Sequence, residues 1–452
     1  MRGMSFGRKA IEDSAPALPP VAAAVSERLL RSGNDRDRIR ALFLSRVDPS
    51  TAAQLDKPRL GAEIERLVDA IATEEKIKVN EREQRELASE LLADMVGLGP
   101  LEPLIEDEQV TDILVNGPNS IYVERKGKLE RTAIRFRDNQ HVVNVAQRIA
   151  SSVGRRVDES SPMVDARLAD GSRVNIVVPP LALDGVSISI RKFAKRALTF
   201  EAMLKQGNVS LPLARTLEIA AASRLNILIS GGTGSGKTTL LNAMSRVIDH
   251  DERIVTIEDA AELQLQQPHV VRLETRPANL EGKGEISQRD LLRNALRMRP
   301  DRIVIGEVRG AEAIDMLQAM NTGHDGSMST IHSNSPRDAL MRLENMVLMG
   351  AVNLPSRAVR AQIVGAINLV VQVERMRDGI RRVQRVTEII GLEGEVITTQ
   401  DLFEYRYEGE GRDGLLKGRY EMAKGLPHFT PRAAYHGLDA ALLEALSMEA
   451  AR

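Results

Sequence analysis

"ILISGGTGSGKTTLLNAM", residues 227–244, decides the fold of this chain. An apolar run is followed by a cluster of glycines and then by apolar residues at helical spacing. Glycines gather where the backbone must adopt positive φ or approach another group closely. Gly231, Gly236, Lys237 and Thr238 match the spacing of the loop whose amides and lysine hold nucleotide phosphates. The stretch therefore predicts a phosphate-binding loop between a strand and a helix.

Each residue type in this loop has an expected task in binding ATP and Mg²⁺. The amides from Gly234 to Thr238 should point at the β-phosphate, because a helix N-terminus favours an anion. Lys237 should bridge the β- and γ-phosphates, Thr238 should coordinate Mg²⁺, and Thr239 should lie near the α-phosphate. A structural glycine turn with an incidental lysine is the alternative. The candidate nucleotide-binding residues of the loop are Gly232, Thr233, Gly234, Ser235, Gly236, Lys237, Thr238 and Thr239.

Two strand ends supply carboxylates that such a loop needs. "RIVTIED" ends in Glu258 and Asp259, and "RIVIGEV" presents Glu307. Phosphoryl transfer requires a carboxylate near the metal and a group that orients the attacking water. We assign Glu307 to Mg²⁺ and Glu258 to the general base, although the two roles could be exchanged. For either residue alone, a solvated acid at a strand end is the competing interpretation.

His324 and His332 flank "DGSMST" eight positions apart. The chain has no cysteine, so a zinc site is disfavoured. A neutral His332 is expected to donate toward the γ-phosphate as a sensor of the nucleotide state. A core histidine is the alternative. Ligands of parallel sheets gather at the carboxyl ends of the strands, where we expect all these polar clusters to lie.

Arginines form a further group of candidates. An arginine supplied by another domain or subunit can raise the rate of phosphoryl transfer by about 10³ to 10⁵. Arg167, Arg173 and Arg191 lie on predicted strands of a preceding domain and are candidate nucleotide contacts, with Arg191 a candidate catalytic residue. Arg276 and Arg309 receive no assigned role. Most surface arginines are simply solvated.

The pattern along the chain predicts several domains, as expected for 452 residues. Residues 1–34 lack periodicity and predict a disordered arm. Residues 35–97 carry apolar residues at helical spacing and predict a helical bundle. Residues 98–205 predict an α+β domain with a mixed or antiparallel sheet. Residues 206–430 alternate apolar strands with helices, which predicts a parallel sheet covered on both faces, and residues 431–452 read as an irregular tail.

Composition disfavours several classes of function. Lysine and arginine (62) balance aspartate and glutamate (63), and aromatic residues make up only 3%, so no nucleic-acid partner is expected. The absence of cysteine excludes disulfides, thiolate metal sites and cysteine nucleophiles. No apolar run approaches the roughly 20 residues that span a bilayer. The proline-containing N-terminal segment makes a poor signal peptide, so a soluble cytoplasmic protein is expected.

Four motifs together resemble those of the secretion-motor ATPase superfamily, which serves type II secretion, type IV pili and type IV secretion. They are a Walker A motif "GGTGSGKTT", an Asp box "IVTIEDAAELQL", an atypical Walker B motif "RIVIGEVRG" and a His box "GHDGSMSTIH". "GLGPLEPLIEDEQVTDILVNGP" and "RLADGSRVNIVVPP" are similar to the CpaF branch, the ATPases of Tad (Flp) pili. The resemblance covers roughly residues 35 to 430. The missing tetracysteine zinc module and the helical extension before residue 97 favour the same branch.

This resemblance implies a RecA-like P-loop motor domain after a PAS-like α+β domain, assembled as a homohexamer at the inner face of the inner membrane. ATP, with Mg²⁺, would lie between the two domains, and N-terminal arginines would close on it. A polytopic inner-membrane platform protein of the pilus is the implied partner. By motif, Lys237 and Thr238 correspond to Walker A, Glu258 to the Asp box, Glu307 to Walker B, and His324 with His332 to the His box. The alternatives are a type IV secretion ATPase moving protein or DNA, a nucleotide-gated scaffold with little turnover, and a RecA-like DNA motor.

Overall fold

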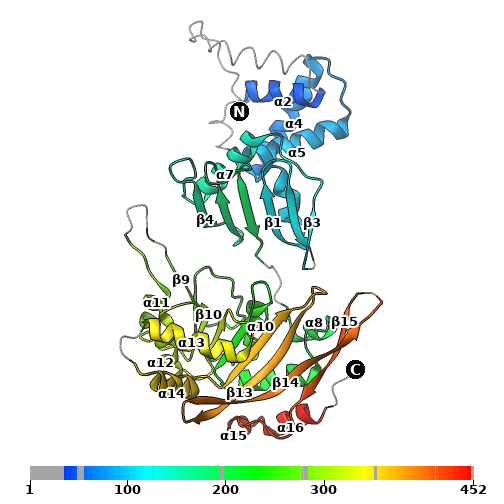
Figure 1. Cartoon of the computed structure of the whole chain (residues 1–452). Coiled ribbons are helices and arrows are strands. Elements are labelled where there is room, and N and C mark those ends of the chain that lie inside the picture. The colour runs from blue at the N-terminus through cyan, green and yellow to red at the C-terminus, as the bar shows by residue number, and fades with distance from the viewer. Residues whose placement is uncertain are drawn as a thin grey trace. The chain divides into compact units, whose positions relative to one another are not determined.

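The computed structural model describes residues 35–47, 55–125, 127–193, 198–276, 278, 283–350, 354–412 and 414–448. The predicted arm of residues 1–34 lies outside the described residues. The chain divides into two compact units, Met1–Lys192 and Phe193–Arg452. Figure 1 shows the elements of both units, which are described separately below.

The first unit begins with the predicted helical bundle. Its helices are α2 (Asp35–Arg46), α4 (Lys57–Glu74) and α5 (Glu81–Val96). The side chain of Asp56 accepts the Arg59 amide at the start of α4, and Asn80 forms a capping box with Glu83 at the start of α5. Such caps satisfy amides that a helix leaves without partners at its first turn. The apolar faces of the three helices share one core.

A six-stranded sheet completes the first unit. All its pairings are antiparallel, in the order β3-β2-β1-β6-β5-β4. The helix α7 (Asn139–Ser152) buries Val142, Val145 and Ile149 in the same core as the strands. The predicted turn at Asp170 and Gly171 joins β4 to β5, and Gly171 has φ of +89°. The remaining elements are η1 (Gly99–Leu101), α6 (Glu102–Glu106), β1 (Val110–Asn116), β2 (Ile121–Arg125), β3 (Lys128–Arg131), β4 (Met163–Arg167), β5 (Arg173–Val177) and β6 (Ser187–Arg191).

The second unit is built on a nine-stranded sheet in the order β15-β14-β13-β12-β7-β11-β10-β8-β9. The strands from β12 to β9 in this order are parallel, and β13, β14 and β15 extend the sheet in antiparallel fashion. The predicted parallel sheet is therefore confirmed for its central part. The strands are β7 (Ile227–Gly231), β8 (Ile254–Glu258), β9 (Val270–Glu274), β10 (Arg302–Val308), β11 (Met328–Ile331), β12 (Leu369–Arg375), β13 (Arg381–Glu393), β14 (Val396–Glu410) and β15 (Leu416–Met422).

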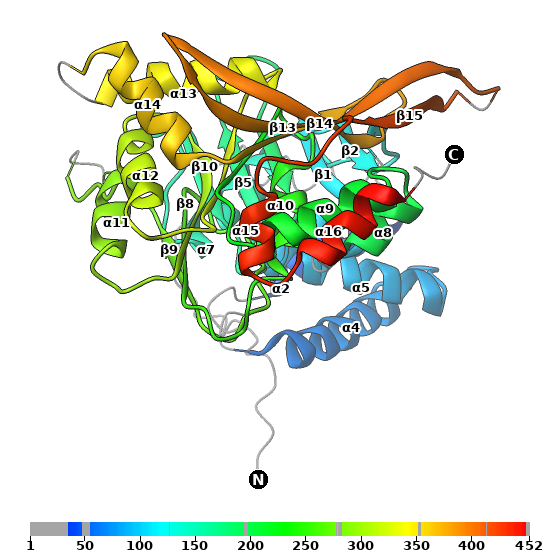
Figure 2. The same ribbon diagram turned by 90° about the horizontal axis from the view of Figure 1, so that it is seen from below.

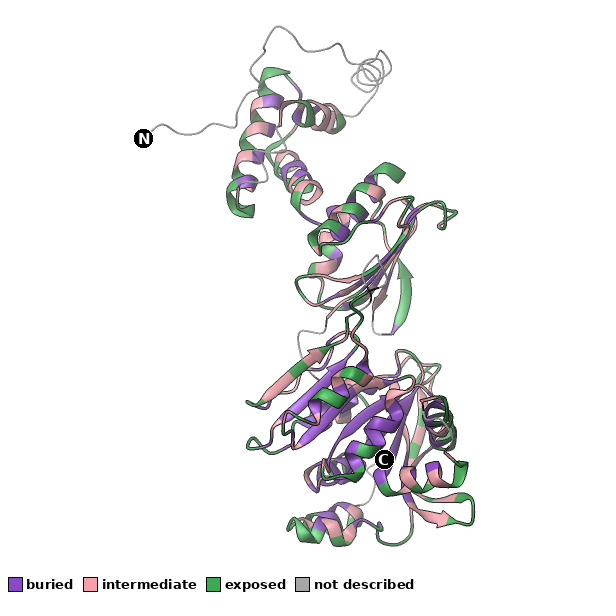
Figure 3. Cartoon of the chain, turned by 90° about the vertical axis from the view of Figure 1, so that its left-hand side faces the viewer, coloured by how far each residue is buried: buried purple, intermediate pink, exposed green. Residues whose placement is uncertain are grey.

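Helices cover both faces of this sheet, as the continuous apolar strands predict. Alternate strand residues enter two separate cores, so that Ile227 and Ile229 lie in one core and Leu228 in the other. The central strands β7, β8, β10, β11 and β12 are accordingly buried along most of their length (Figure 3). One face carries α8 (Phe200–Lys205), α9 (Leu211–Ala222), α10 (Lys237–Ser245), α15 (Thr430–Tyr435) and α16 (Asp439–Ser447). The other carries α11 (Gln288–Ala295), α12 (Glu312–Asn321), α13 (Pro336–Gly350) and α14 (Ser356–Ala366).

Two expectations about the second unit need correction. Phe200 and Met203 of α8 belong to its core, so the unit begins before the predicted boundary at 205. The C-terminal tail is not irregular, because α15 and α16 bury Ala433, Leu442 and Ala445 in the core shared with α9. Figure 2 shows these two helices beside α9. None of the helices in the described ranges combines the length and apolarity needed to cross a bilayer.

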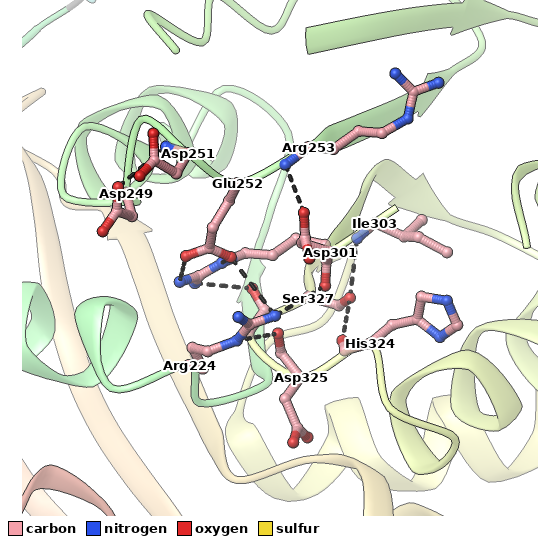
Figure 4. Close-up of polar contacts among 12 residues, drawn as sticks. Arg224, Asp249, Asp251, Glu252, Arg253, Asp301, Ile303, His324, Asp325 and Ser327 are labelled. Atoms are coloured by element: carbon pink, nitrogen blue, oxygen red, sulfur yellow. Dashed lines mark hydrogen bonds and ion pairs between the residues drawn. The ribbon is translucent and has the colours of Figure 1, made fainter. Parts of the chain in front are cut away.

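A buried ion pair ties together the amino ends of the parallel strands. Arg302, fully buried at the start of β10, donates from Nε and Nη2 to the two carboxylate oxygens of Glu252, each at 2.7 Å. Its Nη1 donates to the carbonyls of Ala221 and Gly326. Arg224 lies 3.6 Å from Glu252 and donates to the Asp301 carbonyl (Figure 4). The cluster links the C-terminal end of α9 with the entries to β8, β10 and β11.

Replacing Glu252 with alanine should lower the free energy of unfolding of this unit by about 3–5 kcal/mol, because the buried guanidinium of Arg302 loses its charged partner. Urea unfolding followed by tyrosine fluorescence reports on this unit, since Tyr122 alone of the five tyrosines lies in the first. Arg215→Met is the control, because Arg215 forms an exposed pair with Glu218 worth less than about 1 kcal/mol. Equal unfolding midpoints for the two variants would contradict this account of the cluster.

Candidate functional site

The loop predicted to bind phosphate joins β7 to α10, as the motif predicts. Gly234 and Gly236 have φ of +68° and +99°, a region that suits glycine. A Cβ on Gly231 would lie 2.3 Å from the Val373 carbonyl oxygen, so only glycine fits against β12. Gly236 is the N-cap of α10, and no side chain caps this helix. The start of α10 therefore presents backbone amides and the positive end of its dipole.

Lys237 is the first residue of α10 and is buried. Its Nζ donates to the carbonyls of Gly231 and Gly232, each at 2.9 Å. The ammonium group is thus held by backbone carbonyls at the start of the loop. A phosphate chain held by the α10 amides would offer this group a stronger, charge-assisted acceptor.

A carboxylate network joins three strands at the same edge of the sheet. Glu307 Oε1 lies 3.0 Å from His332 Nε2, and its Oε2 accepts from Arg309 Nη2 at 2.7 Å. Arg309 Nη1 also donates to Asp259 at 3.1 Å. Asp259 follows β8, Glu307 lies near the end of β10, and His332 follows β11. Glu307 and His332 are therefore in direct contact, and Arg309 connects Glu307 to Asp259.

Burial lowers the pKa of His332, and the positive charge of Lys237 lowers it further, while Glu307 opposes both effects. The neutral imidazole is consequently favoured near neutral pH. A neutral ring can donate one hydrogen bond and accept another. His332 thus has the chemistry of a relay between Glu307 and a group bound at the loop.

Glu258, at the end of β8, is only 3% exposed. Its Oε2 accepts the amides of Glu262 at 2.7 Å and Leu263 at 3.0 Å, whereas Oε1 is buried without a hydrogen-bond partner. Burial raises the pKa of Glu258 to about 7, even though the two amides lower it. A carboxylate with this pKa and a buried, unsatisfied oxygen fits a general base that accepts a proton from water.

The backbone amides at the start of α10 and the Lys237 ammonium suit a nucleoside triphosphate accompanied by Mg²⁺. Mg²⁺ usually takes one or two protein oxygens and completes its shell with phosphates and water. The Thr238 hydroxyl, one residue into α10, and the Glu307 carboxylate are the candidate protein ligands. Of the other loop candidates, Gly232 to Gly236 lie in the turn between β7 and α10, and Thr239 lies in the first turn of α10.

The structure does not bring His324 to this site. His324 precedes β11 and His332 follows it, so the two histidines lie at opposite ends of one strand. His324 Nδ1 is 3.1 Å from the Ala319 carbonyl, and Figure 4 shows the residue beside Asp325 and Ser327 near the buried ion pair. The expectation that every polar cluster lies at the carboxyl edge is therefore wrong for His324.

Arg167, Arg173 and Arg191 all lie in the first unit. Strand register places Arg167 opposite Arg173, and Arg173 opposite Arg191, in one row across β4, β5 and β6. Arg191 also pairs with Asp112 of β1 at 3.4 Å. The approach of these three arginines to a nucleotide stays a prediction.

Three arginines of the second unit lie at the candidate site: Arg309, which received no role from the sequence, and Arg375 and Arg381, which sequence reasoning missed. Arg309 bridges Glu307 and Asp259. Arg381 Nε donates to the Gly234 carbonyl at 2.7 Å, and Arg375 lies opposite Arg381 in the β12–β13 pair. The alternation of "VERMRDGIRRV" around Asp378 and Gly379 was a hairpin signal that could have placed the last two.

Comparison with known proteins gives a consistent set of relatives. A family model described as "Type II/IV secretion system protein" matches residues 94–397. A putative conjugal transfer protein of Mycobacterium tuberculosis is 41% identical over 312 residues, 68% of this chain and 88% of the relative. The type IV secretion system protein VirB11 of Brucella suis is 32% identical over 313 residues, 63% of this chain and 87% of the relative. The crystal structure of the Brucella suis VirB11 ATPase with sulphate covers 64% of this chain and 94% of its own, with 32% identity and a TM-score of 0.35.

Proposed function

The chain belongs to the type II/IV secretion system protein family, and we propose that it is an ATPase that couples ATP hydrolysis to mechanical work. One observation carries this proposal. The phosphate-binding loop, the Glu307–His332 pair and the buried Glu258 gather at the carboxyl edge of one parallel sheet. Ligands of such sheets bind at this edge.

In the proposed reaction, water attacks the γ-phosphate in line with the bond to ADP. Lys237 and the α10 amides hold the β- and γ-phosphates and stabilise the charge that develops on them. Glu258 accepts the proton of the attacking water through Oε1. Glu307 and Thr238 would hold Mg²⁺ through their side-chain oxygens, and the bound ion would neutralise further phosphate charge. His332 transmits the presence of the γ-phosphate to Glu307 through their contact.

The machine that this ATPase drives is proposed to be the Tad (Flp) type IV-like pilus. The protein would act as a cytoplasmic homohexamer on a polytopic platform protein of the inner membrane. This part rests on the motif resemblance to the CpaF branch. The conjugal transfer and type IV secretion relatives support a second candidate, an ATPase that moves protein or DNA through a type IV secretion channel. Crosslinking in cells, followed by identification of the membrane partner, separates a pilus platform protein from a secretion coupling protein.

A nucleotide-gated scaffold is the candidate from another class. Its sites would bind ATP and organise a complex without productive turnover. The buried Glu258, whose Oε1 has no hydrogen-bond partner, favours turnover, because a site that only binds ATP needs no group that accepts a proton from water. ATP binding without phosphate release, even with the membrane partner present, would favour the scaffold.

Replacing Gly306 with alanine should lower kcat for ATP about tenfold to a hundredfold, since misplacing a reacting group by about 1 Å can cost a hundredfold. A Cβ on Gly306 would lie 2.8 Å from Glu258 Cγ and push the carboxylate out of place. Gly310→Ala is the matched control, because its Cβ would meet only Glu312 Oε2 at 3.4 Å. Both rates come from phosphate release at saturating ATP. Equal rates in the two variants would show that the position of Glu258 does not limit hydrolysis.

A further inference from the structure

Two arginines that flank the turn of the β12–β13 hairpin lie against the loop between β7 and α10. Arg381 Nε donates a 2.7 Å hydrogen bond to the Gly234 carbonyl. A Cβ on Gly236 would lie 3.2 Å from Arg381 Cδ, and a Cβ on Gly234 would lie 3.8 Å from Arg375 Nη1. Both side chains therefore border the glycines that lead into α10.

Strand pairing forces the two cations into this position. Arg375 ends β12, Arg381 begins β13, and the two residues are direct partners in the antiparallel pair. Direct partners project from the same face of a sheet. β12 is also the parallel neighbour of β7, with Val373 opposite Gly231 at the start of the loop. Both guanidinium groups are thus carried by the hairpin that adjoins the strand leading into the loop.

The backbone at Arg381 is held firmly. Asn208 Nδ2 donates to the Arg381 carbonyl at 2.5 Å, and the Asn208 carbonyl accepts from the Val383 amide at 3.0 Å. The hydroxyl of Tyr420 donates to the same Asn208 carbonyl at 2.7 Å. These contacts fix the start of β13, so the guanidinium reaches the loop from a rigid strand. Groups placed on rigid elements lose little entropy when a ligand binds.

We propose that Arg375 and Arg381 form a cationic clamp, supplied in cis, that contacts the α- and β-phosphates of the bound nucleotide. The inference rests on the proposed function and adds residues to it. The planar guanidinium offers paired donors that match phosphate oxygens. ATP and ADP both carry α- and β-phosphates, so the clamp strengthens the binding of both. It consequently controls how long ADP is retained after hydrolysis.

The affinity for a fluorescent ADP analogue tests the clamp directly. Arg381→Gln and Arg375→Gln should each raise the Kd for ADP about tenfold to a hundredfold, the loss expected for one charge-assisted hydrogen bond. Inorganic pyrophosphate should raise the melting temperature of the wild type and do so less in both variants. Arg377→Gln is the matched control in the same hairpin, because Arg377 contacts Glu410 and Tyr407 instead. Arg381→Lys keeps the positive charge but loses the paired donors of the guanidinium, and it should show an intermediate Kd for ADP.

The outcomes separate the clamp from the function on which it rests. A wild-type protein that binds neither ADP nor ATP contradicts the proposed ATPase itself. Wild-type binding with an unchanged Kd in Arg375→Gln and Arg381→Gln overturns the clamp alone. An equal loss in Arg377→Gln also overturns it, because the effect would then follow from the charge of the whole hairpin. If Arg381→Gln does not fold, Arg381→Lys and Arg375→Gln decide the question.

Discussion

Replacing Lys237 with alanine should lower the rate of ATP hydrolysis by at least about a hundredfold, because the phosphates lose the positive charge nearest to the bond that breaks. The structure places this ammonium on the carbonyls of Gly231 and Gly232, within the loop itself. Its charge also lowers the pKa of His332, which places it close to the Glu307–His332 pair. Steady-state phosphate release at saturating ATP and Mg²⁺ measures the effect.

Lys205→Ala is the matched control for this variant. Lys205 is exposed at the end of α8, in the same unit as the loop. Its removal should leave both hydrolysis and the melting temperature unchanged. Lys237→Ala should retain the circular dichroism spectrum of the wild type, since no core packing depends on the Lys237 ammonium. A folded Lys237→Ala variant that turns over ATP as fast as Lys205→Ala would exclude the loop as the reaction site.

Glu258→Gln should lower kcat about a hundredfold to ten thousandfold, the contribution expected of a general base. The change removes the base but keeps both hydrogen bonds from the backbone, because the glutamine side-chain carbonyl still accepts from the amides of Glu262 and Leu263. A general base acts only when ionised. Burial raises the pKa of Glu258 to about 7, so kcat/KM of the wild type should fall as the pH drops through about 7.

The pH profile also decides between the two carboxylates. kcat/KM reports the ionisations of the free enzyme, which is the state described by the structure. The fall below pH 7 should disappear in Glu258→Gln and persist in Glu307→Gln. If it persists in Glu258→Gln and disappears in Glu307→Gln, Glu307 is the base and Glu258 serves the metal or its water.

The central fold was predictable because its signals are local. The apolar runs of β7, β8, β10, β11 and β12 alternate with helices that carry readable caps. Ser287 forms the capping box of α11, and Ser335 Oγ accepts the Asp338 amide at the start of α13. The loop between strand and helix was predicted from the spacing of Gly231, Gly236, Lys237 and Thr238. These features depend on residues close together in sequence.

The missed elements lack such local signals. β15 reads "LKGRYEM", in which polar residues and a glycine hide the strand, and it forms only by pairing with β14. α15 and α16 are short and alanine-rich, and their burial against α9 comes from tertiary packing. Tertiary context regularly overrides such weak local preferences.

The candidate site was predictable where strand direction alone decides it. Glu307 and His332 both lie at the carboxyl ends of parallel strands, and their side chains are in contact. The same rule should have placed His324 at the other edge, because β11 separates it from His332. Arg381 lies 147 positions from Gly234 in the sequence, and the two meet because β12 pairs with β7, a long-range pairing that the local hairpin signal does not encode.

The most direct test of the account is phosphate release from ATP by the purified protein over a range of protein concentrations, with Lys237→Ala and Glu307→Gln measured alongside. The account predicts a Mg²⁺-dependent specific rate that climbs with protein concentration, as expected of an oligomeric ATPase. Lys237→Ala should lower this rate by at least about a hundredfold, and Glu307→Gln should lower it strongly while leaving a measurable rate. Release that is unchanged in Lys237→Ala, or a wild-type protein that neither binds nor hydrolyses ATP at any concentration, would contradict the assignment of this site.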